Sequence, residues 1–505
     1  FLPTAPFRAG ETVTVRGRLT LAAGAHAFAY RFTVSRPDTT LFTAGALGER
    51  DPNEKQHFHS APTLLAPLIA VTASSPQTSP GDIFTAPYAG PGPSGPMIFD
   101  STGSLIWFDP LPRGTEATNL QVQQSGGAPV LTWWQGRITL QGFGQGEEMI
   151  ADSSYRQIGR VHAGNGFNAD LHDFHLMGNG TALLTVFDPI ECSLSSTGGP
   201  PAGAVSDSIM EELDISTGLV RREWHSLDHV SLGDSYSSAR SASNHWPFDY
   251  FHLNSIDQLP DGHTLISARN TSALYELDTM TGRVLTRIGG RHSDVRLGHG
   301  AATAYQHDAE VLADGTISIF DNGALPKVHP QTRGLIVSID PHKRTDSVLR
   351  QLVHPNTPLS SGSQGNLQSL PGGDLFMGWG SEPYFSEFNA AGTLLFDAHM
   401  RGSYQSYRSY RFAWTGAPAQ PPSVAVAAAT KTAPTTVYAS WNGDTRTAFW
   451  RVLAGPSAQA LSAVAGAPRS GFETAIGLPA RQPFVAVQAL DGTGNVLATS
   501  TPVAG

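Results

Sequence analysis

Short runs of alternating apolar and polar residues fill most of the chain, and each run ends at a turn-forming residue. A period of two residues is typical of β-strands with one buried face, whereas an amphipathic helix needs a period near 3.6. No stretch of useful length has the helical period. The 53 Gly and 36 Pro residues are spread evenly between the apolar runs, as many short strands with tight turns require. The pattern therefore predicts an all-β protein.

One hairpin unit recurs along the chain. It consists of an apolar strand end, an Asp or Asn, a short turn and a second apolar strand. Its turn residues are Asp100, Asp152, Asp214, Asp278, Asp340 and Asn389, spaced by 52, 62, 64, 62 and 49 residues. A second unit, with a polar start, a strand, a glycine turn and a returning strand, begins at His172, His252, His307 and Asn366. Radially repeated four-stranded sheets have this organisation, so we predict a six-bladed β-propeller over 76–416. A barrel or a large sandwich would not explain the period.

Both ends of the chain fall outside this repeat. Residues 1–75 contain an alternating strand pair, which predicts a small N-terminal β cap. Residues 407–411 lie where the ring of blades would close, and we expect them to act as a structural clasp. A Pro-rich stretch after Trp414 predicts a linker. Residues 423–505 then show about six short strands, which favour an immunoglobulin- or fibronectin-like β-sandwich.

Charge and composition narrow the function. The formal net charge is −10 and no basic run is present, which disfavours nucleic acid and anionic membranes as partners. Pro62 and Pro67 interrupt the longest apolar stretch, which is too short to span a bilayer, so no transmembrane segment is expected. The single Cys192 excludes an intrachain disulfide and a cysteine metal site.

The compartment is indicated by weak and opposing signals. A lone cysteine favours a reducing compartment. The sequence starts at Phe1 without an initiator Met, and it carries two Asn-x-Ser/Thr sequons, at Asn179 and Asn270. We expect a secreted or extracellular protein.

Histidines recur at equivalent positions of the repeat. The innermost strand of each blade lines the axis of a propeller, and the positions eight residues before the turn glycine hold His172, Asn254 and His307. His252 lies two residues before Asn254, hence on the same face of its strand. A lone buried histidine is usually structural, but three that converge favour function as nucleophile, general base or metal ligand.

Other residues complete the predicted site. Asn366 begins the corresponding strand of the next blade, and we group it with His172 and Asn254 as substrate-binding. Trp133 and Trp134 are candidates for an aromatic floor under a flat substrate, although packing inside a blade is the stronger interpretation. Arg269 or Arg333 would neutralise an anionic leaving group, because a guanidinium presents paired donors to an oxyanion.

Several stretches resemble the arylsulfotransferase family, in the branch common in fungi and actinobacteria. They include VLTWWQG (130–136), DYFHLNSID (249–257) and QHDAEVLADGTISIFDNG (306–323), and together the matching stretches cover nearly all of 80–416. The resemblance implies a six-bladed propeller. It also implies transfer of a sulfuryl group between phenols through a sulfated histidine, within a ring of histidines with an arginine and without a nucleotide donor. By local motif, His252 and His307 resemble two of those histidines.

The leading hypothesis is an arylsulfotransferase-like transferase that acts on an aryl ester at a histidine-lined central funnel. His252 or His307 would be the nucleophile or base, with a small aromatic substrate and neither cofactor nor metal. One alternative is a metal-dependent propeller enzyme in which His172, His252 and His307 leave an open coordination position. Another is a non-catalytic propeller that binds a small aromatic or a glycan.

Overall fold

The computed structural model describes residues 7–8, 10–21, 24–34, 54–429 and 434–505. The chain divides into two compact units, Phe1–Phe42 and Thr43–Gly505. Almost all regular structure in the described residues is β-strand, which confirms the all-β class. The described helices are one turn each: α1 (Ser226–His229) and the 3₁₀ helices η3 (Ser195–Thr197) and η4 (Leu232–Asp234).

The N-terminal unit contains the predicted strand pair. β1 (Thr12–Leu21) and β2 (Gly24–Thr33) form an antiparallel hairpin in which Val13 faces Phe32 and Val15 faces Tyr30. Because side chains alternate across a strand, these four residues share one apolar face.

Six antiparallel sheets of four or five strands make up most of the described part of the second unit. The first two sheets are β7 (Glu116–Ser125), β8 (Ala128–Ile138), β9 (Gly144–Ala151), β10 (Gln157–Val161), then β11 (Phe174–Leu176), β12 (Thr181–Cys192), β13 (Gly203–Asp214), β14 (Val220–His225). The next two are β15 (Leu253–Gln258), β16 (His263–Ala268), β17 (Ala273–Asp278), β18 (Val284–Gly289), then β19 (His307–Val311), β20 (Ile317–Asp321), β21 (Arg333–Asp340), β22 (Thr345–Leu352). The fifth is β23 (Asn366–Ser369), β24 (Leu375–Gly378), β25 (Tyr384–Phe388), β26 (Leu394–Met400) and β3 (Ile69–Ser74); the sixth is β27 (Ser409–Phe412), β4 (Asp82–Thr85), β5 (Met97–Phe99) and β6 (Leu105–Phe108).

The sixth sheet joins the two ends of this region. β27 pairs with β4, with Tyr410 opposite Phe84, so the segment predicted as a clasp does close the ring of sheets. β3 lies within the range predicted as an N-terminal cap, yet it pairs with β26 and covers the outer edge of the fifth sheet. An unpaired outer edge would invite aggregation, which gives the pairing a physical reason.

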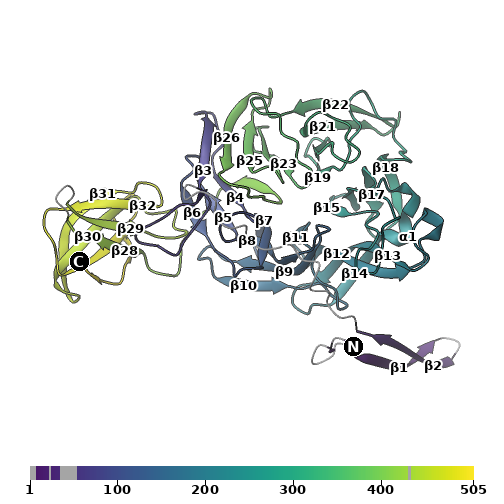
Figure 1. The fold of residues 1–505 in the computed structure, drawn as a ribbon, viewed down its shortest axis with the longest axis horizontal. Coiled ribbons are helices and arrows are strands. Elements are labelled where there is room, and N and C mark those ends of the chain that lie inside the picture. The colour runs from purple at the N-terminus through teal and green to yellow at the C-terminus, as the bar shows by residue number, and fades with distance from the viewer. Residues whose placement is uncertain (1–6, 9, 22–23, 35–53, 430–433) are drawn as a thin grey trace. The chain divides into compact units, whose positions relative to one another are not determined.

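The sheets are arranged radially, with β7, β11, β15, β19 and β23 toward the centre of the second unit (Figure 1). Apolar side chains fill the space between neighbouring sheets; Phe320, Leu367 and Trp379, for example, belong to one buried cluster. This arrangement is propeller-like. It brings the first residues of the inner strands together at one axis, where the site lies.

The C-terminal strands form two further sheets around their own core. One sheet contains β28 (Ser423–Ala427), β29 (Thr435–Ser440) and β32 (Glu473–Leu478). The other contains β31 (Ala460–Pro468), β30 (Phe449–Ser457), β33 (Phe484–Leu490), β34 (Val496–Thr499) and β35 (Val503–Ala504). Val437, Trp450 and Val487 are buried in the cluster that the two sheets share.

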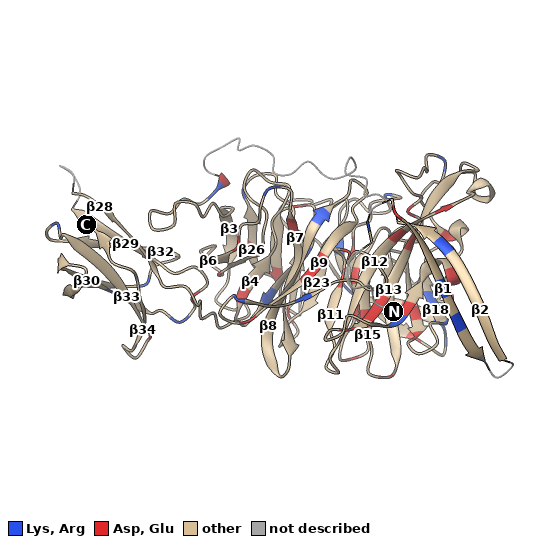
Figure 2. Cartoon of the chain, turned by 90° about the horizontal axis from the view of Figure 1, so that it is seen from below, with Lys and Arg blue, Asp and Glu red and all other residues tan. Residues whose placement is uncertain are grey.

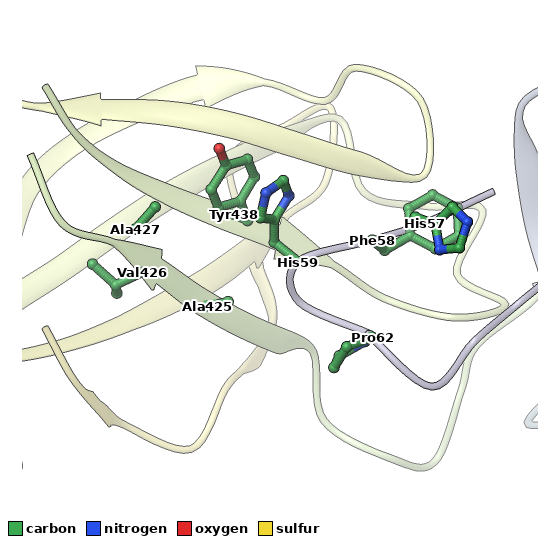
Figure 3. A pocket seen from close by; sticks show the side chains of 8 residues that line it. All are labelled: His57, Phe58, His59, Pro62, Ala425, Val426, Ala427 and Tyr438. Carbon is green, nitrogen blue, oxygen red and sulfur yellow. The ribbon is translucent and has the colours of Figure 1, made fainter. Parts of the chain in front are cut away.

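This C-terminal region is attached by more than the predicted linker. The His59 ring stacks on Tyr438, 3.8 Å between centroids and 11° between planes (Figure 3). The Glu473 carboxylate accepts hydrogen bonds from the backbone N–H groups of His59 and Ser60 at 3.1 and 2.6 Å. Phe472 packs on Phe58 with ring centroids 4.3 Å apart. A cavity of ≈ 480 Å³ lies beside the stacked rings. The junction is therefore a packed interface.

Charged residues of both signs are interspersed along the described sheets and do not gather in one basic region (Figure 2). Among the described residues, no helix has the length and apolar character needed to cross a membrane.

Candidate functional site

Three histidines from successive sheets meet near the axis. The Nε2 atoms of His172 and His252 are 3.0 Å apart, and the two rings are nearly perpendicular with centroids 4.7 Å apart. His307 is close enough that both other imidazoles influence its pKa. All three side chains are buried, with 2%, 0% and 1% of their surface exposed. The three histidines chosen from the sequence therefore lie near one another, but they do not line an open funnel.

Two carboxylates orient the His172–His252 pair. Asp170 Oδ2 lies 2.5 Å from His172 Nδ1, and Asp249 Oδ2 lies 2.5 Å from His252 Nδ1. If both histidines donate through Nδ1, both Nε2 atoms carry lone pairs, which would repel each other at 3.0 Å. A hydrogen must therefore lie between the two Nε2 atoms. The chain of two carboxylates and two imidazoles thus holds a proton that can be given up or taken back.

His307 has a different hydrogen-bond environment. Its Nδ1 donates to Asn322 Oδ1 at 2.8 Å and to the Tyr305 carbonyl oxygen at 3.0 Å. Both partners accept, so the proton resides on Nδ1 and Nε2 carries the lone pair. The Gln364 backbone N–H donates a hydrogen bond to that lone pair at 3.2 Å. Burial, followed by the charge of Arg269, holds the pKa of His307 well below its usual value. His307 is therefore a neutral imidazole at neutral pH.

Strained backbone positions present these groups. His252 has a φ of 62° and precedes β15, whose pairing shifts register between Leu253 and Ser255. Asp308, beside His307, has a φ of 51° next to a register shift in β19. Positive φ is costly for residues with a side chain, and bulges re-aim side chains at functional sites. His252 therefore reaches the axis from a bulge. The sequence had predicted that it lies on the face of a regular strand, which is not how it is positioned.

Arg269 connects the histidines to a cavity. Its backbone N–H donates to the His252 carbonyl oxygen, and its Nη2 donates to Asp249 Oδ2 at 3.1 Å. Its guanidinium lies over the Tyr305 ring, 4.3 Å from the centroid. Arg269, Asp249 and Tyr305 line a cavity of ≈ 260 Å³. Burial raises the pKa of Asp249 to about 6, although Arg269 opposes the shift. The cavity thus reaches the groups that flank the histidines.

The axis itself is filled by side chains from the closing segment. The Tyr407 ring lies 5.2 Å from the His172 ring and 6.2 Å from the His307 ring. Arg408 forms ion pairs with Asp173 at 3.0 Å and with Asp308 at 3.2 Å. These contacts explain why the predicted funnel is closed in this structure.

Other predicted site residues lie close by but serve the framework. Asn254 Nδ2 donates to the Gln306 carbonyl oxygen at 2.8 Å, and Asn254 O accepts from Arg408. The Asn366 amide exchanges two hydrogen bonds with the Ser409 backbone, which ties β23 to β27. The amide of Asn366 is used at both ends, so it is not available to a substrate.

The two tryptophans belong to the core. Trp133 lies 6.1 Å from Trp107, and Trp134 donates to the Ala169 carbonyl oxygen at 2.9 Å. They belong to different buried clusters because neighbouring residues of β8 face opposite sides. Both side chains are buried in the core, in keeping with the packing interpretation preferred for them.

Arg333 makes its contacts elsewhere. Its guanidinium binds Asp321 at 2.8 Å, Gln351 at 2.9 Å and the Ala302 carbonyl oxygen at 2.9 Å. The donors of Arg333 are engaged in these contacts. Of the two arginines, Arg269 is therefore the one that lies beside the histidines.

The metal alternative has no support in the geometry of the described residues, where no group of three His, Cys, Asp or Glu side chains is arranged to hold a metal ion. In the His172–His252 pair, both Nδ1 atoms face carboxylates and the Nε2 atoms face each other. No nitrogen of the pair is left to converge with His307 on one metal.

Sequence reasoning missed the partners of the histidines. Asp170 stands two residues before His172 and Asp249 three residues before His252, and this short spacing was a usable signal. Asn322 offered none, because only the pairing of β19 with β20 brings it to His307.

The fold and the site define a class: an all-β protein of radially arranged sheets with a buried histidine–carboxylate site near the axis. The chain belongs to the arylsulfotransferase (ASST) family, whose model matches residues 121–401. This membership indicates an arylsulfotransferase-like transferase.

No match was found among curated proteins. Solved structures with detectable similarity include a protein of unknown function from Bacteroides caccae, 14% identical over 66% of this chain and 100% of that chain, with a TM-score of 0.38. A catalytically inactive variant of virginiamycin B lyase from Staphylococcus aureus, solved with quinupristin, is 9% identical over 74% of this chain and 97% of that chain, with a TM-score of 0.33. Similarity at this level carries no argument about this chain.

Proposed function

We propose that the six sheets are the blades of a six-bladed β-propeller, that the C-terminal sheets form an immunoglobulin- or fibronectin-like sandwich, and that the protein transfers a sulfuryl group from an aryl sulfate to a phenol. Family membership supports the reaction class. The pairing of β27 with β4 and the radial order of the sheets support the propeller. The histidine site supports the chemistry.

His307 is the nucleophile in this proposal. The observation that carries it is the contrast between Nε2 environments: that of His252 is engaged by the His172 side chain at 3.0 Å, whereas that of His307 accepts one hydrogen bond, from the Gln364 backbone N–H at 3.2 Å. An imidazole attacks through a lone pair, so it must be neutral and its tautomer fixed. Asn322 and the Tyr305 carbonyl oxygen fix that tautomer.

The His172–His252 pair supplies and recovers the proton. In the first half-reaction, His307 Nε2 forms an N–S bond while the S–O bond to the aryl oxygen breaks. The aryl oxygen leaves with the bonding electrons and takes the proton held between the two Nε2 atoms. In the second, the pair takes a proton from an acceptor phenol, whose oxygen forms a new S–O bond as the N–S bond breaks. His307 is then restored.

Arg269 stabilises the negative charge of the transferring group. A guanidinium in a site of low dielectric constant lowers the free energy of a developing oxyanion more than it would in water. The aryl ring enters by the cavity that Arg269 and Tyr305 line. Tyr305 joins the two parts, because its ring lies over Arg269 and its carbonyl oxygen accepts from His307 Nδ1.

The test is to identify the sulfated residue. The full-length protein is mixed with a chromogenic aryl sulfate without acceptor, quenched rapidly at alkaline pH, and mapped by peptide mass spectrometry. We expect release of one phenol per protein and a sulfuryl adduct on the peptide containing His307, absent in His307→Asn. An adduct on His252, or steady turnover without any adduct, would contradict the assignment of the nucleophile. No phenol release from any aryl sulfate would contradict sulfuryl transfer itself.

A further inference from the structure

The cavity that reaches Arg269 has a buried inner end and an exposed outer end. Its volume is ≈ 260 Å³. The lining side chains of the inner end include Phe248 and Arg269, which are 4% and 9% exposed. Those of the outer end include Leu140 and Trp246, which are 55% and 40% exposed. A ligand whose charged end lies beside Arg269 therefore extends toward Leu140 and Trp246.

Leu140 and Trp246 come from separate segments that are tied together. Leu140 belongs to the connection between β8 and β9, and Trp246 to the loop between η4 and β15. The residues next to them are joined, because Gln141 Nε2 donates to the Pro247 carbonyl oxygen at 2.9 Å. Two backbone hydrogen bonds with Ser243, at 2.8 and 3.1 Å, fix the Trp246 backbone. Two large apolar side chains are thus held at the mouth of the cavity, where a ligand that covers them would remove apolar surface from water.

The volume of the cavity limits how much of a substrate it encloses. An apolar cavity of about 150 Å³ holds benzene. The ≈ 260 Å³ here therefore suit one ring together with the charged group that it carries. A second ring would lie at the outer end, against Trp246 and Leu140. There it would bury apolar area and could stack on the indole, and both contributions favour binding.

We propose that Trp246 and Leu140 determine specificity by binding the second ring of substrates with two fused or linked aromatic rings. This inference rests on the proposed function, which puts the sulfuryl group beside Arg269 and the first ring inside the cavity. A one-ring substrate occupies the same cavity but leaves both apolar side chains exposed. Two-ring aryl sulfates and phenols are therefore the preferred donors and acceptors.

The experiment measures binding apart from turnover, with aryl sulfonates as probes. A sulfonate keeps the negative charge of an aryl sulfate, but its sulfur is bonded to a ring carbon, so there is no aryl oxygen to leave. In calorimetric titrations of the full-length protein, we expect 2-naphthalenesulfonate to bind about tenfold more tightly than benzenesulfonate. In Trp246→Ala this ratio should fall to about twofold, because only Leu140 remains beside the second ring. Trp246→Phe keeps an aromatic face and should retain most of the ratio.

Tyr236 provides the matched control. It lies in the same loop as Trp246 and is also 40% exposed, but it is not part of the cavity lining. Its ring packs against Arg291, whose guanidinium lies 4.4 Å from the ring centroid. Tyr236→Ala therefore removes an exposed aromatic side chain of this loop without changing the cavity, and the ratio should keep its wild-type value.

Equal affinities of the wild-type protein for the two sulfonates, or no binding of either, would overturn the inference even if Trp246→Ala fails to fold. So would a ratio that persists in folded Trp246→Ala, or one that falls equally in Tyr236→Ala. Steady-state assays with 2-naphthyl sulfate and phenyl sulfate separate this inference from the proposed function. Turnover of both with equal kcat/KM would leave sulfuryl transfer standing and contradict the specificity. A naphthyl preference in binding without turnover of either sulfate would refute sulfuryl transfer and retain the binding site.

Discussion

His252, near the axis, and His225, at the end of β14, each pair with a carboxylate, but the pKa of one is lowered and the pKa of the other is raised. His252 and His225 each face a carboxylate through Nδ1, at 2.5 Å from Asp249 and 2.8 Å from Asp207. Burial, then the charges of Arg269 and His172, lower the pKa of His252 well below its usual value. At His225 burial also lowers the pKa, but Asp207 and Glu223 outweigh it and the pKa is raised.

The difference shows that a histidine–carboxylate pair does not by itself define an active imidazole. The His225 side chain is 31% exposed and has two carboxylates and no arginine among its charged partners. These carboxylates favour its protonated form. His252 and His307 are desolvated beside a cation, which lowers the pKa of both. A neutral imidazole can attack an electrophile through its lone pair, and an imidazolium cannot.

The largest expected effect separates the two regions by rate. His307→Asn keeps a hydrogen-bonding side chain of similar size but removes the nucleophile, so kcat for an aryl sulfate should fall about 10²-fold or more. His225→Asn is the matched control and should leave kcat unchanged. Steady-state assays of both purified variants check this. Equal losses would show that the cluster near the axis has no special role, and no loss in His307→Asn would place the nucleophile elsewhere.

A smaller effect is expected at Arg269. Lysine keeps the charge but lacks the planar, forked donors that bind Asp249 and Asn270 together, so Arg269→Lys should lower kcat/KM about tenfold. Arg333→Lys is the comparison, since its contacts lie with Asp321 and Gln351. We expect it to affect thermal stability and not kcat/KM. A similar kcat/KM loss in both variants would argue against a specific role for Arg269.

The comparison also predicts a pH profile. Catalysis requires neutral His307, whose pKa lies well below its ordinary 6.5. As pH falls, kcat/KM should therefore hold through pH 6.5 and decline only at lower pH. Asp249, with a pKa of about 6, takes up a proton in that same range, and His172, His252, Arg269 and Asn270 are the groups that face it. A profile that declines already above pH 6.5 would show that His307 is not desolvated.

The sequence was sufficient to predict the sheets and the histidines that come together, because both follow from a repeat that places equivalent residues at one axis. His172 and His307 were found in this way, and His252 by its place two residues before Asn254. The route was partly wrong, since His252 reaches the axis through a backbone with a φ of 62°. Strain of this kind depends on neighbouring strands and leaves no pattern in the sequence.

The remaining site residues show what tertiary packing adds. Arg269 and Arg333 were equivalent by sequence, and only their partners, Asp249 and Asp321, distinguish them. The axis is filled by Tyr407 and Arg408. These residues were predicted to join the ends of the ring of sheets, and not to fill its centre. Side chains that fill a shared centre come from several sheets, so their contacts cannot be deduced from one strand at a time.

The smallest expected effect is on stability, and its pH dependence has opposite signs in the two regions. The raised pKa of His225 means that its contribution is present below pH 6.5 and is lost as pH rises through the folded-state value. Because the side chain is 31% exposed, we expect His225→Asn to lose less than about 1 kcal/mol at pH 6 and nothing at pH 9.

For His307 the sign reverses: the unfolded chain binds a proton below pH 6.5 that the folded site excludes, so the wild type loses stability on acidification and His307→Asn loses less. Urea unfolding of both variants from pH 5 to pH 9 measures the two slopes. Parallel slopes would mean that the two imidazoles have similar surroundings, and the contrast drawn between them would fail.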